Sequence, residues 1–247
     1  MQIRIATFNI HKGFSHFNLR VAVHDIRERL RAVDADVVFL QEVQGGHLLH
    51  PQRHPEWPAQ PQHEFLADSV WPAFAYGRNS VYEHGHHGNA ILSRYPIVAA
   101  DNLDISSHRF ERRGLLHCEI GLPDARGSLH CLCVHLALTE RGRHHQIAAL
   151  VARVREHVPD GAPLVIAGDF NDWRGRAGRQ LMLALGVREV FGEGGGRAAR
   201  SFPSTLPVLR LDRIYVRGLS IRGAAVHHGL RWSRVSDHAL LTAQLAL

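Results

Sequence analysis

Residues 164–172 (LVIAGDFND) contain the residues whose types and spacing most clearly suggest chemistry. The apolar run that opens the segment predicts a buried strand, and Gly168 lets the backbone turn after it. Asp169 and Asn171 follow two residues apart, so both side chains point the same way on an extended backbone. A carboxylate can accept a proton from water, and an amide can donate hydrogen bonds to an anion. The pair suits activation of water beside a phosphate, although an Asx-rich turn after a core strand has the same pattern.

Further polar residues stand at the ends of apolar segments elsewhere in the chain. They are Asn9, Glu42, His135, Asp212, Asp237 and His238. Glu42, with Asn9 or Asp237 in support, offers oxygen ligands for a hard divalent ion such as Mg²⁺. A charged residue after a buried strand also fits the start of a surface loop, and Glu42 alone does not decide between the two.

Two histidines in this set can exchange protons near neutral pH. Asp212 can orient His238, fix its tautomer and favour its charged form. No serine or cysteine stands in a nucleophile setting such as G-x-S-x-G, so covalent acyl chemistry has no support. The residues together favour hydrolysis by activated water.

The elements that must position these side chains are short apolar strands alternating with amphipathic helices. Strands are expected at 3–10, 36–40, 74–77, 89–93, 114–120, 129–136, 164–167, 211–216, 220–226 and 239–245. Apolar residues at helical spacing predict helices over 19–33 and 147–158, and a loop with a short helix over 174–185. Residues 44–64 show no periodicity and are expected to form a long loop, and 192–197 a flexible surface loop. These elements run from end to end, so we expect one α/β domain over 1–247.

Composition and charge narrow the class of protein. The net charge is +6, and Lys12 is the one lysine, so arginine carries nearly all the positive charge. Arginine suits an anionic phosphate partner, but a biased genome composition would produce the same count. Three cysteines in strand-like segments (Cys118, Cys131, Cys133) are expected to be buried and reduced. Neither a membrane-spanning run nor a signal peptide is evident, and a cytoplasmic location is the default expectation.

Seven segments in order resemble the endonuclease/exonuclease/phosphatase (DNase I-like) superfamily. They are TFNIHKG, DVVFLQEV, GNAILSRYP, CVHL, GDFND, LDRIYV and SDH. The resemblance covers roughly residues 3–245, and the ordered set is very specific. It implies a four-layer sandwich, with two β-sheets face to face and helices outside. It also implies Mg²⁺-dependent hydrolysis of a phosphate ester, with Mn²⁺ as a substitute metal.

The resemblance also implies roles for individual residues. Glu42 would bind the metal, with Asn9 close by. Asp169 would position or deprotonate the attacking water, and Asn171 would hold a phosphoryl oxygen. His238 would pair with Asp212 and contact the phosphate, as base or as electrostatic stabiliser. Asp237 is a further metal-ligand candidate, and His135 falls where nuclease and sphingomyelinase members carry a histidine thought to protonate the leaving oxygen.

Departures from the pattern bear on the substrate. Abasic-site endonucleases of the superfamily typically show a Trp-Asn start, a tyrosine at the position of His135 and a Cys-Pro after the final SDH. This chain has Phe8, His135 and Ala239 there, and His11 stands where many members carry Asp or Asn. The sequence is most similar to small bacterial members and to the neutral sphingomyelinase-like branch. This favours a phosphodiesterase or phosphatase that acts on a phospholipid.

Two alternatives stay open. A nuclease would show a basic stripe with aromatic residues beside the site. Candidates for it are Arg112, Arg113, Trp173, Arg174, Arg176 and Trp232. A non-catalytic module that binds a phosphate ligand is the alternative from another class.

Contacts with substrate are the least determined feature. Further candidates for the pocket rim are Arg78, His86, His87 and Asn89. Asn89 fits a structural role in a turn equally well. No amphipathic membrane anchor is visible, so peripheral contact with a membrane would depend on arginine and on the 44–64 loop with its Trp57. No obligate protein partner is evident.

Overall fold

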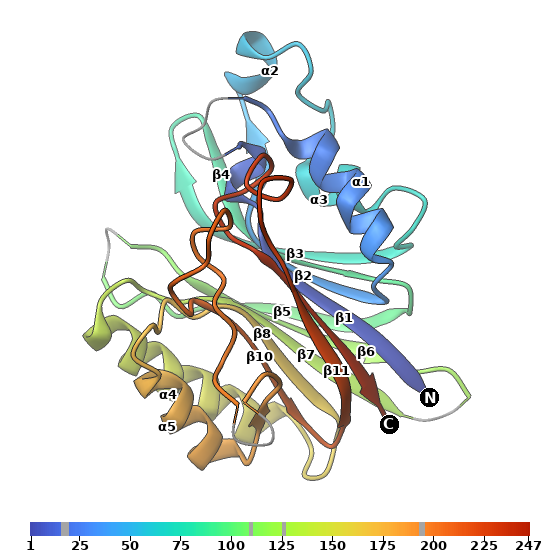
Figure 1. Ribbon diagram of the computed structural model, residues 1–247, viewed down its shortest axis with the longest axis vertical. Coiled ribbons are helices and arrows are strands. Elements are labelled where there is room, and N and C mark those ends of the chain that lie inside the picture. The colour runs from blue at the N-terminus through green and yellow to red at the C-terminus, as the bar shows by residue number, and fades with distance from the viewer. Residues whose placement is uncertain (16–19, 109–110, 125–126, 193–195) are drawn as a thin grey trace.

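Two β-sheets pack face to face, and helices cover their outer faces, in the computed structural model of the chain (Figure 1). The structure describes residues 1–15, 20–108, 111–124, 127–192 and 196–247. Each sheet has six strands among these residues. The architecture confirms the four-layer sandwich. Within the described ranges no helix is both long enough and apolar enough to cross a membrane.

The first sheet has the strand order β11-β12-β1-β2-β4-β3. Its strands are β1 Gln2–Asn9, β2 Val37–His47, β3 Ala73–Tyr82, β4 Gly85–Ser93, β11 Ser220–His227 and β12 Leu240–Ala246. Strands β1 and β2 are parallel, and the other neighbours are antiparallel. Both ends of the chain therefore contribute to this sheet, with the last strand beside the first.

The second sheet has the order β5-β6-β7-β8-β10-β9. Its strands are β5 Ile97–Asp104, β6 Gly114–Gly121, β7 Ser128–His135, β8 Leu164–Asp169, β9 Arg188–Glu189 and β10 Asp212–Arg217. Strands β7 and β8 are parallel, so their C-terminal ends meet at one edge of the sheet.

Helices form the two outer layers. They are the short 3₁₀ helix η1 His11–Gly13 and the α-helices α1 Val23–Val33, α2 His50–Arg53, α3 Gln62–Ala67, α4 Glu140–His157 and α5 Arg176–Leu185. Helices α1 and α3 cover the first sheet, and α4 and α5 cover the second (Figure 1).

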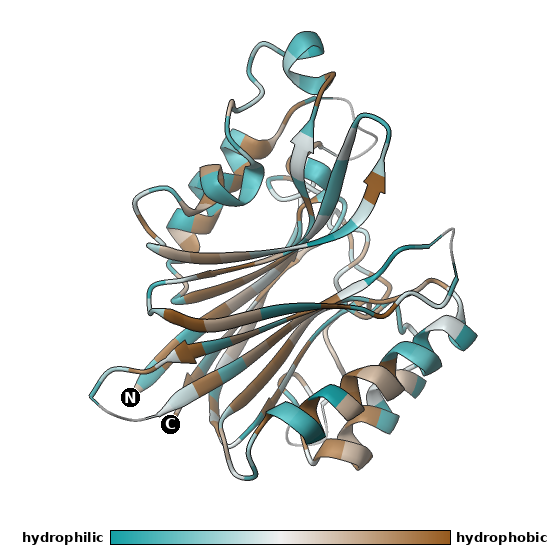
Figure 2. Ribbon diagram, turned by 180° about the vertical axis from the view of Figure 1, so that it is seen from behind, coloured by the Kyte–Doolittle hydropathy of each residue, from teal (hydrophilic) through white to brown (hydrophobic). Residues whose placement is uncertain are grey.

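Alternation of apolar residues along the strands produces this layering. Val37 and Phe39 of β2 face the core between the sheets, while Val38 and Leu40 face the core beneath α1. Both sets are fully buried, because a strand covered on both faces reads as a continuous apolar run. Figure 2 shows the same distribution, with apolar strand residues inside and polar residues on the outer faces of the helices.

The three cysteines are free and buried, as expected. Burial raises the pKa of Cys118 to about 12, so this thiol stays protonated at neutral pH. Cys133 accepts a hydrogen bond from Gln41 at 3.3 Å and packs within the sandwich. These thiols therefore act as small core residues.

The long loop expected over residues 44–64 is wrong. Strand β2 continues to His47, α2 follows, and α3 begins at Gln62. Trp57, expected to be available to a membrane, instead packs against Phe14 with ring centroids 5.3 Å apart. A hydrogen bond from Gln44 N to Gln62 Oε1 at 2.8 Å ties the segment to the sheet. Tertiary contacts, rather than local periodicity, order it.

Smaller differences concern element ends. Strands β5 and β9 were not expected, and α1 begins at Val23 rather than in the segment before it. Leu19, residues 125–126 between the strands expected at 114–120 and 129–136, and residues 193–195 of the surface loop expected at 192–197 lie outside the described residues.

Candidate active site

Three polar residues lie side by side at the end of the second sheet where strands β7 and β8 finish and β10 begins. His135 ends β7 and is the parallel partner of Asp169, which ends β8. Asp212 begins β10 and is the antiparallel partner of the same Asp169. All three side chains are buried. Strand register therefore assembles residues that are distant in sequence.

Gly168 permits the close approach of β8 to β7 at this edge. Its φ is +145°, and an added Cβ would lie 2.0 Å from the carbonyl oxygen of Val134. No side chain fits there without moving the backbone of β7. The glycine before Asp169 is thus required by the fold of the site.

The first sheet supplies the opposite wall. Asn9 ends β1, and its Nδ2 donates to Glu42 Oε1 at 3.3 Å and to Asp169 Oδ2 at 3.2 Å. One amide therefore links carboxylates from both sheets. The amide stays in place because Asn9 Oδ1 accepts the backbone N–H of His11 at 3.1 Å.

Left-handed backbone conformations cluster around these residues. Glu42, Asn171, His11 and Lys12 have φ values of 55°, 49°, 46° and 56°. Asparagine tolerates this region, but glutamate, histidine and lysine rarely adopt it. Glu42 interrupts the pairing of β2 with β4, where the register shifts between Leu40 and Val43. Such strain persists where the surrounding structure imposes it, and it is common at functional sites.

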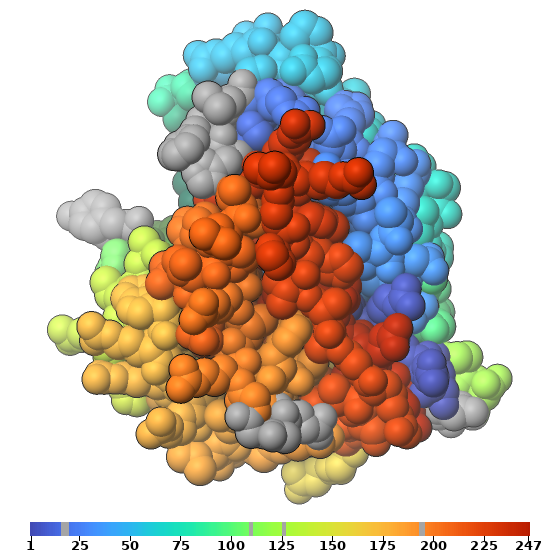
Figure 3. All heavy atoms as spheres, viewed as in Figure 1, coloured from blue at the N-terminus to red at the C-terminus, as the bar shows by residue number. Residues whose placement is uncertain are grey.

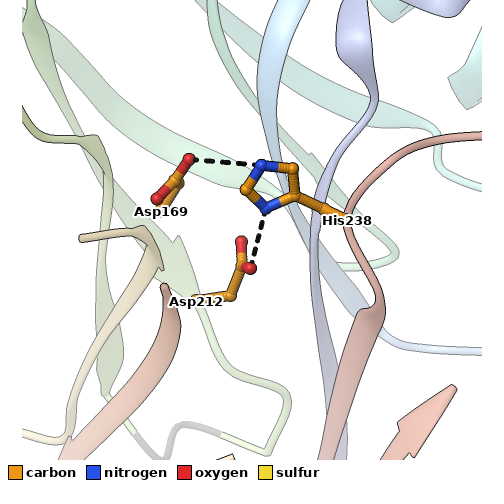
Figure 4. Close-up of side chains that lie close together, drawn as sticks. All are labelled: Asp169, Asp212 and His238. Atoms are coloured by element: carbon orange, nitrogen blue, oxygen red, sulfur yellow. Dashed lines mark hydrogen bonds and ion pairs between the residues drawn. The ribbon is translucent and has the colours of Figure 1, made fainter. Parts of the chain in front are cut away.

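A buried histidine lies between two carboxylates (Figure 4). His238 Nδ1 is 2.9 Å from Asp212 Oδ2, and Nε2 is 3.8 Å from Asp169 Oδ2. Burial alone disfavours the imidazolium, but Asp212 and Asp169 outweigh it and raise the pKa of His238 to about 10. The backbone N–H of His238 donates to Ser236 Oγ at 3.1 Å, which holds the main chain that carries the ring. His238 is therefore charged at neutral pH.

The pKa values of Asp169 and His135 are shifted in opposite directions, and burial is the main cause of both shifts. Burial raises the pKa of Asp169 to about 6, against the effect of the His238 charge. Burial, together with the charge of Arg113, lowers the pKa of His135 well below its usual value. His135 Nε2 lies 3.5 Å from Asp169 Oδ2. The site thus combines a carboxylate of raised basicity with a neutral and a charged imidazole.

These groups line a pocket of about 460 Å³. Its described lining consists of Lys12, Glu42, His87, Arg113, His135, Leu138, Asp169, Asn171, Trp173, Phe202, Leu209, Leu211 and His238. Two cationic side chains and the charged His238 face two carboxylates there, and apolar residues form the rest of the wall. This arrangement suits an anionic group attached to an apolar body.

The structure brings most of the expected site residues together, but not all. Glu42, His135, Asp169, Asn171, His238, Arg113 and Trp173 line the pocket, with Asn9 and Asp212 hydrogen-bonded behind it. Asp237 is not among the lining residues, and its Oδ1 lies 3.4 Å from His11 Nδ1. Its assignment to the metal has no support from this placement.

Two residues expected to contact substrate are not among the described residues that line this pocket. Arg78 is exposed on β3 and does not line the pocket. Asn89 is buried within β4, where Nδ2 donates to the carbonyl oxygens of Gly114 and Cys133. It therefore holds the two sheets together, and it does so from a strand rather than a turn. Of the histidines suggested for the rim, His87 lines the pocket, while His86 contacts the Tyr76 hydroxyl at 3.0 Å.

Sequence reasoning missed Lys12 and an apolar wall. Lys12 lies in the quoted TFNIHKG segment, and its Nζ is 4.0 Å from Glu42 Oε2. Phe202 and Leu209 come from the segment before β10, in which no motif was evident, and Leu211 is the first residue of the quoted LDRIYV segment. The position of Lys12 within the TFNIHKG segment was the signal from which this residue could have been found.

Glu42 fits a hard divalent cation better than the buried cluster does. Within the described part of the chain, only Asp169, Asp212 and His238 bring three ligand atoms within 4.8 Å of one another. His238 Nδ1 is hydrogen-bonded to Asp212 and Nε2 faces Asp169, so the contacts within that cluster are those of an ion-paired network. Glu42 is partly exposed in the pocket, with the amide of Asn9 beside it. Oxygen donors of this kind suit Mg²⁺ or Mn²⁺.

The fold and the site define a DNase I-like hydrolase of phosphate esters. A model of the Endonuclease/Exonuclease/phosphatase family matches residues 6–238, and the chain belongs to this family. Enzymes of the family generally depend on a divalent metal.

Relatives and solved structures agree with this assignment. The chain is 48% identical to YbhP of Escherichia coli K12 over 244 residues, which covers 99% of this chain and 96% of YbhP. It resembles the structure of an endonuclease/exonuclease/phosphatase from Beutenbergia cavernae, with a TM-score of 0.76, 20% identity and coverage of 100% of this chain and 72% of that one. A mannosyl-6-phosphatase from Bacteroides thetaiotaomicron gives a TM-score of 0.74, 14% identity and coverage of 99% and 100%. The similarity to the neutral sphingomyelinase-like branch stays a prediction.

Proposed function

We propose that the protein is a Mg²⁺-dependent phosphodiesterase or phosphatase that hydrolyses a phospholipid by in-line attack of water. The observation that carries this proposal is the position of the Asp169 carboxylate, whose pKa is about 6, in a pocket beside Lys12, Arg113 and charged His238. A general base that works near neutral pH would therefore lie beside cationic groups that stabilise negative charge on a phosphate.

Asp169 is the group that would orient and deprotonate water. General bases work best when their pKa lies near the operating pH, and a pKa of about 6 leaves Asp169 ionised at neutral pH. Its Oδ1 accepts the backbone N–H of Asn171 at 3.0 Å, which fixes the carboxylate. Oδ2 faces Asn9 and the two histidines. When bound at Glu42, Mg²⁺ or Mn²⁺ would supply positive charge to the phosphoryl oxygens.

His238 would stabilise charge rather than remove a proton. Its Nδ1 is committed to Asp212, and the ring is already protonated at neutral pH. The Nε2–H is left to donate toward a phosphoryl oxygen. Asn171 Nδ2 donates to the carbonyl oxygen of Leu136 at 2.9 Å, which leaves its second N–H for the substrate. His135, neutral in the free enzyme, is placed to donate a hydrogen bond near the leaving oxygen.

Exposed apolar side chains at the pocket mouth favour a lipid substrate. Leu138, Trp173 and Leu209 line the pocket while remaining 61%, 43% and 39% exposed. Leu206 and Val208, on the segment that carries Leu209, are 73% and 53% exposed. Exposure of several apolar side chains to water beside a phosphate site is unfavourable unless a ligand or a membrane covers them. A phospholipid supplies both the phosphate and the apolar partner.

A nuclease is less well supported by the arrangement of the candidate basic stripe. Arg174 and Arg176 form ion pairs with Glu140. Trp232 packs edge-on against Phe8, with ring centroids 5.9 Å apart. Arg113 and Trp173 alone of the six candidates are among the described lining residues. The other four candidates do not line the described part of the pocket.

The test is hydrolysis of a substrate panel with Mg²⁺, Mn²⁺ or EDTA. The panel contains bis-p-nitrophenyl phosphate, p-nitrophenyl phosphate, sphingomyelin, cardiolipin, plasmid DNA and RNA. We expect metal-dependent turnover with phospholipid preferred, and at least about a hundredfold loss in Asp169→Ala and His238→Ala. Preference for DNA or RNA would replace the lipid assignment with the nuclease. Absence of turnover on every substrate, with folded protein and bound metal, would favour a non-catalytic phosphate-binding module.

A further inference from the structure

A second cavity of about 460 Å³ lies between helix α5 and the edge of the second sheet formed by β10 and β9. Among described residues it shares no lining residue with the catalytic pocket. In Figure 3 the orange segment leading to β10 lies on the viewed face, between the lighter orange residues of α5 and the red C-terminal segment. The chemistry proposed above uses none of the residues that line it.

Strand register places the polar residues of this cavity on one face. Arg213 and Tyr215 are two residues apart on β10, and Tyr215 is the antiparallel partner of Glu189. Side chains at such positions point to the same side of a sheet. Gly178 of α5 lies opposite, and an added Cβ there would be 2.2 Å from the Tyr215 hydroxyl. The absence of a side chain at Gly178 thus lets the Tyr215 hydroxyl pack directly against α5.

Two buried charged groups in this cavity lack complete hydrogen bonding. Arg213 is 3% exposed, and its Nη2 donates to the carbonyl oxygen of Asp172 at 2.9 Å. Glu189 is 8% exposed, and its Oε2 accepts the backbone N–H of Gly192 at 2.6 Å. Arg213 Nη1 and Glu189 Oε1 have no hydrogen-bond partner in the described part of the chain. Tyr215 interacts with the same guanidinium without completing a well-formed bond to Nη1.

An unpaired hydrogen-bond donor and an unpaired acceptor in one cavity indicate a ligand that carries both an acceptor and a donor. Leaving such groups unsatisfied costs about 1–3 kcal/mol each, and more when they are charged. Exposed Arg179 lies at the same cavity, so arginines outnumber Glu189 there. Met182 and Val187 provide apolar wall. A cavity of this volume accommodates a small organic molecule.

We propose that this cavity is a second binding site, for a small hydroxylated organic anion. Its phosphate or carboxylate accepts hydrogen bonds from Arg213 Nη1 and Arg179, and its hydroxyl group donates to Glu189 Oε1. The carbon body lies against Met182 and Val187. The inference is independent of the substrate proposed for the catalytic pocket.

Methionine NMR tests this site directly, because the chain has two methionines, Met1 and Met182. Metal-free protein labelled at the methionine methyl carbons is titrated with glycerol 3-phosphate, glycerate, inorganic phosphate and glycerol. We expect the Met182 signal to shift saturably with glycerol 3-phosphate or glycerate, and Met1 to stay in place. The two anions distinguish a phosphate from a carboxylate site. Glycerol has no negative charge for Arg213, and inorganic phosphate has no carbon body to contact Met182 and Val187, so both are expected to bind at least about tenfold more weakly than glycerol 3-phosphate.

Variants separate the cavity from the catalytic pocket. Glu189→Gln and Arg179→Gln are expected to weaken the saturable shift by about tenfold or more. Arg113→Gln, which alters the catalytic pocket, leaves the shift unchanged. Arg179 is exposed, so its replacement tests binding even if a variant at buried Glu189 fails to fold. An unmoved Met182 signal in millimolar glycerol 3-phosphate and glycerate, or a shift that Arg113→Gln abolishes, would overturn the proposal.

Discussion

At the scale of single residues, the site depends on electrostatic coupling across a buried pair of carboxylates. Asp169 and Asp212 are direct neighbours across β8 and β10, and two negative charges so placed would repel. Charged His238 lies between them and offsets that repulsion. Protonation of His238 and ionisation of Asp169 therefore support each other.

Replacing Asp212 tests this coupling. Asp212→Asn keeps the shape of the residue but removes the charge that favours the imidazolium, so the pKa of His238 should fall from about 10 toward or below 6.5. Nitrogen NMR of the His238 ring in metal-free protein, from pH 5 to 10, measures this change. A His238 pKa that does not differ between wild type and variant would show that Asp212 is not the cause.

The raised pKa of His238 also predicts how the free energy of unfolding depends on pH. His238 has a folded pKa of about 10, above the value of 6.5 for an unfolded histidine. The folded state thus binds the proton more tightly, and this contribution is fully present below pH 6.5. It is lost as pH rises from about 6.5 to 10. Urea unfolding across this range should show wild type losing its stability advantage over His238→Gln, and a constant difference would contradict the prediction.

Backbone strain at Glu42 predicts a difference between two substitutions. Its φ of 55° suits asparagine better than alanine, so Glu42→Asn should be more stable than Glu42→Ala by about 1 kcal/mol. Both variants remove the carboxylate and should lose activity. Urea denaturation compares them under one condition. Equal stability of the two variants would show that the left-handed conformation carries no strain.

At the scale of elements, the close contact of β7 with β8 predicts an unequal effect of two glycine substitutions. Gly168→Ala brings a Cβ within 2.0 Å of the Val134 carbonyl oxygen, and we expect a loss of about 3 kcal/mol or more. Gly161→Ala is the control, because Gly161 also has a positive φ (+79°) but no atom within 4 Å of the added Cβ. Its cost should be about 1 kcal/mol. Chemical denaturation giving equal losses would assign the effect to φ alone.

The elements that position the catalytic residues could be predicted because each is a buried strand ending in a polar residue. Residues 164–169 and 129–135 have this pattern, and β8 and β7 match it closely. Strand β5 was missed because it lies at a sheet edge, where most of its residues are exposed and the apolar pattern disappears. Strand β9 has two residues, too few for any periodicity.

The same local signals explain which site residues could be predicted from the sequence and which could not. Asp169 was found because it ends strand β8, and Glu42 was found because it follows the apolar run 36–40, although β2 continues past it to His47. Arg78 and Asn89 were misplaced, because which face of β3 or β4 meets the pocket depends on bulges that no local signal reveals. Lys12 was missed because it enters the pocket from a left-handed turn.

At the scale of the whole molecule, the site joins two sheets, and the first of them contains strands from both ends of the chain. Asn9 comes from the first strand, and His238 lies just before the last. The catalytic geometry therefore exists only when β12 pairs with β1 and the two sheets are packed. Loss of either contact would remove the charged imidazole from the pocket.

The apolar residues around the mouth predict a selective effect on membrane substrates. Leu206→Ser with Val208→Ser should lower turnover of phospholipid in vesicles by about a hundredfold, since burial of each of the two side chains is worth about 1.5 kcal/mol or more. Turnover of bis-p-nitrophenyl phosphate, which needs no membrane, should stay unchanged. Leu183→Ser is a matched control, because Leu183 is 83% exposed on α5 and is not among the described lining residues of the catalytic pocket. Equal effects of all the variants on vesicles would argue against contact of this surface with lipid.

The most direct test of the central claim is the dependence of turnover on Mg²⁺ concentration in wild type and Glu42→Gln. Bis-p-nitrophenyl phosphate serves as substrate, after removal of metal with EDTA and its restoration. If Glu42 holds the metal that assists hydrolysis, the variant will need at least about tenfold more Mg²⁺, or will lose turnover at every concentration. Identical Mg²⁺ curves for wild type and variant, or full turnover in EDTA, would contradict the account.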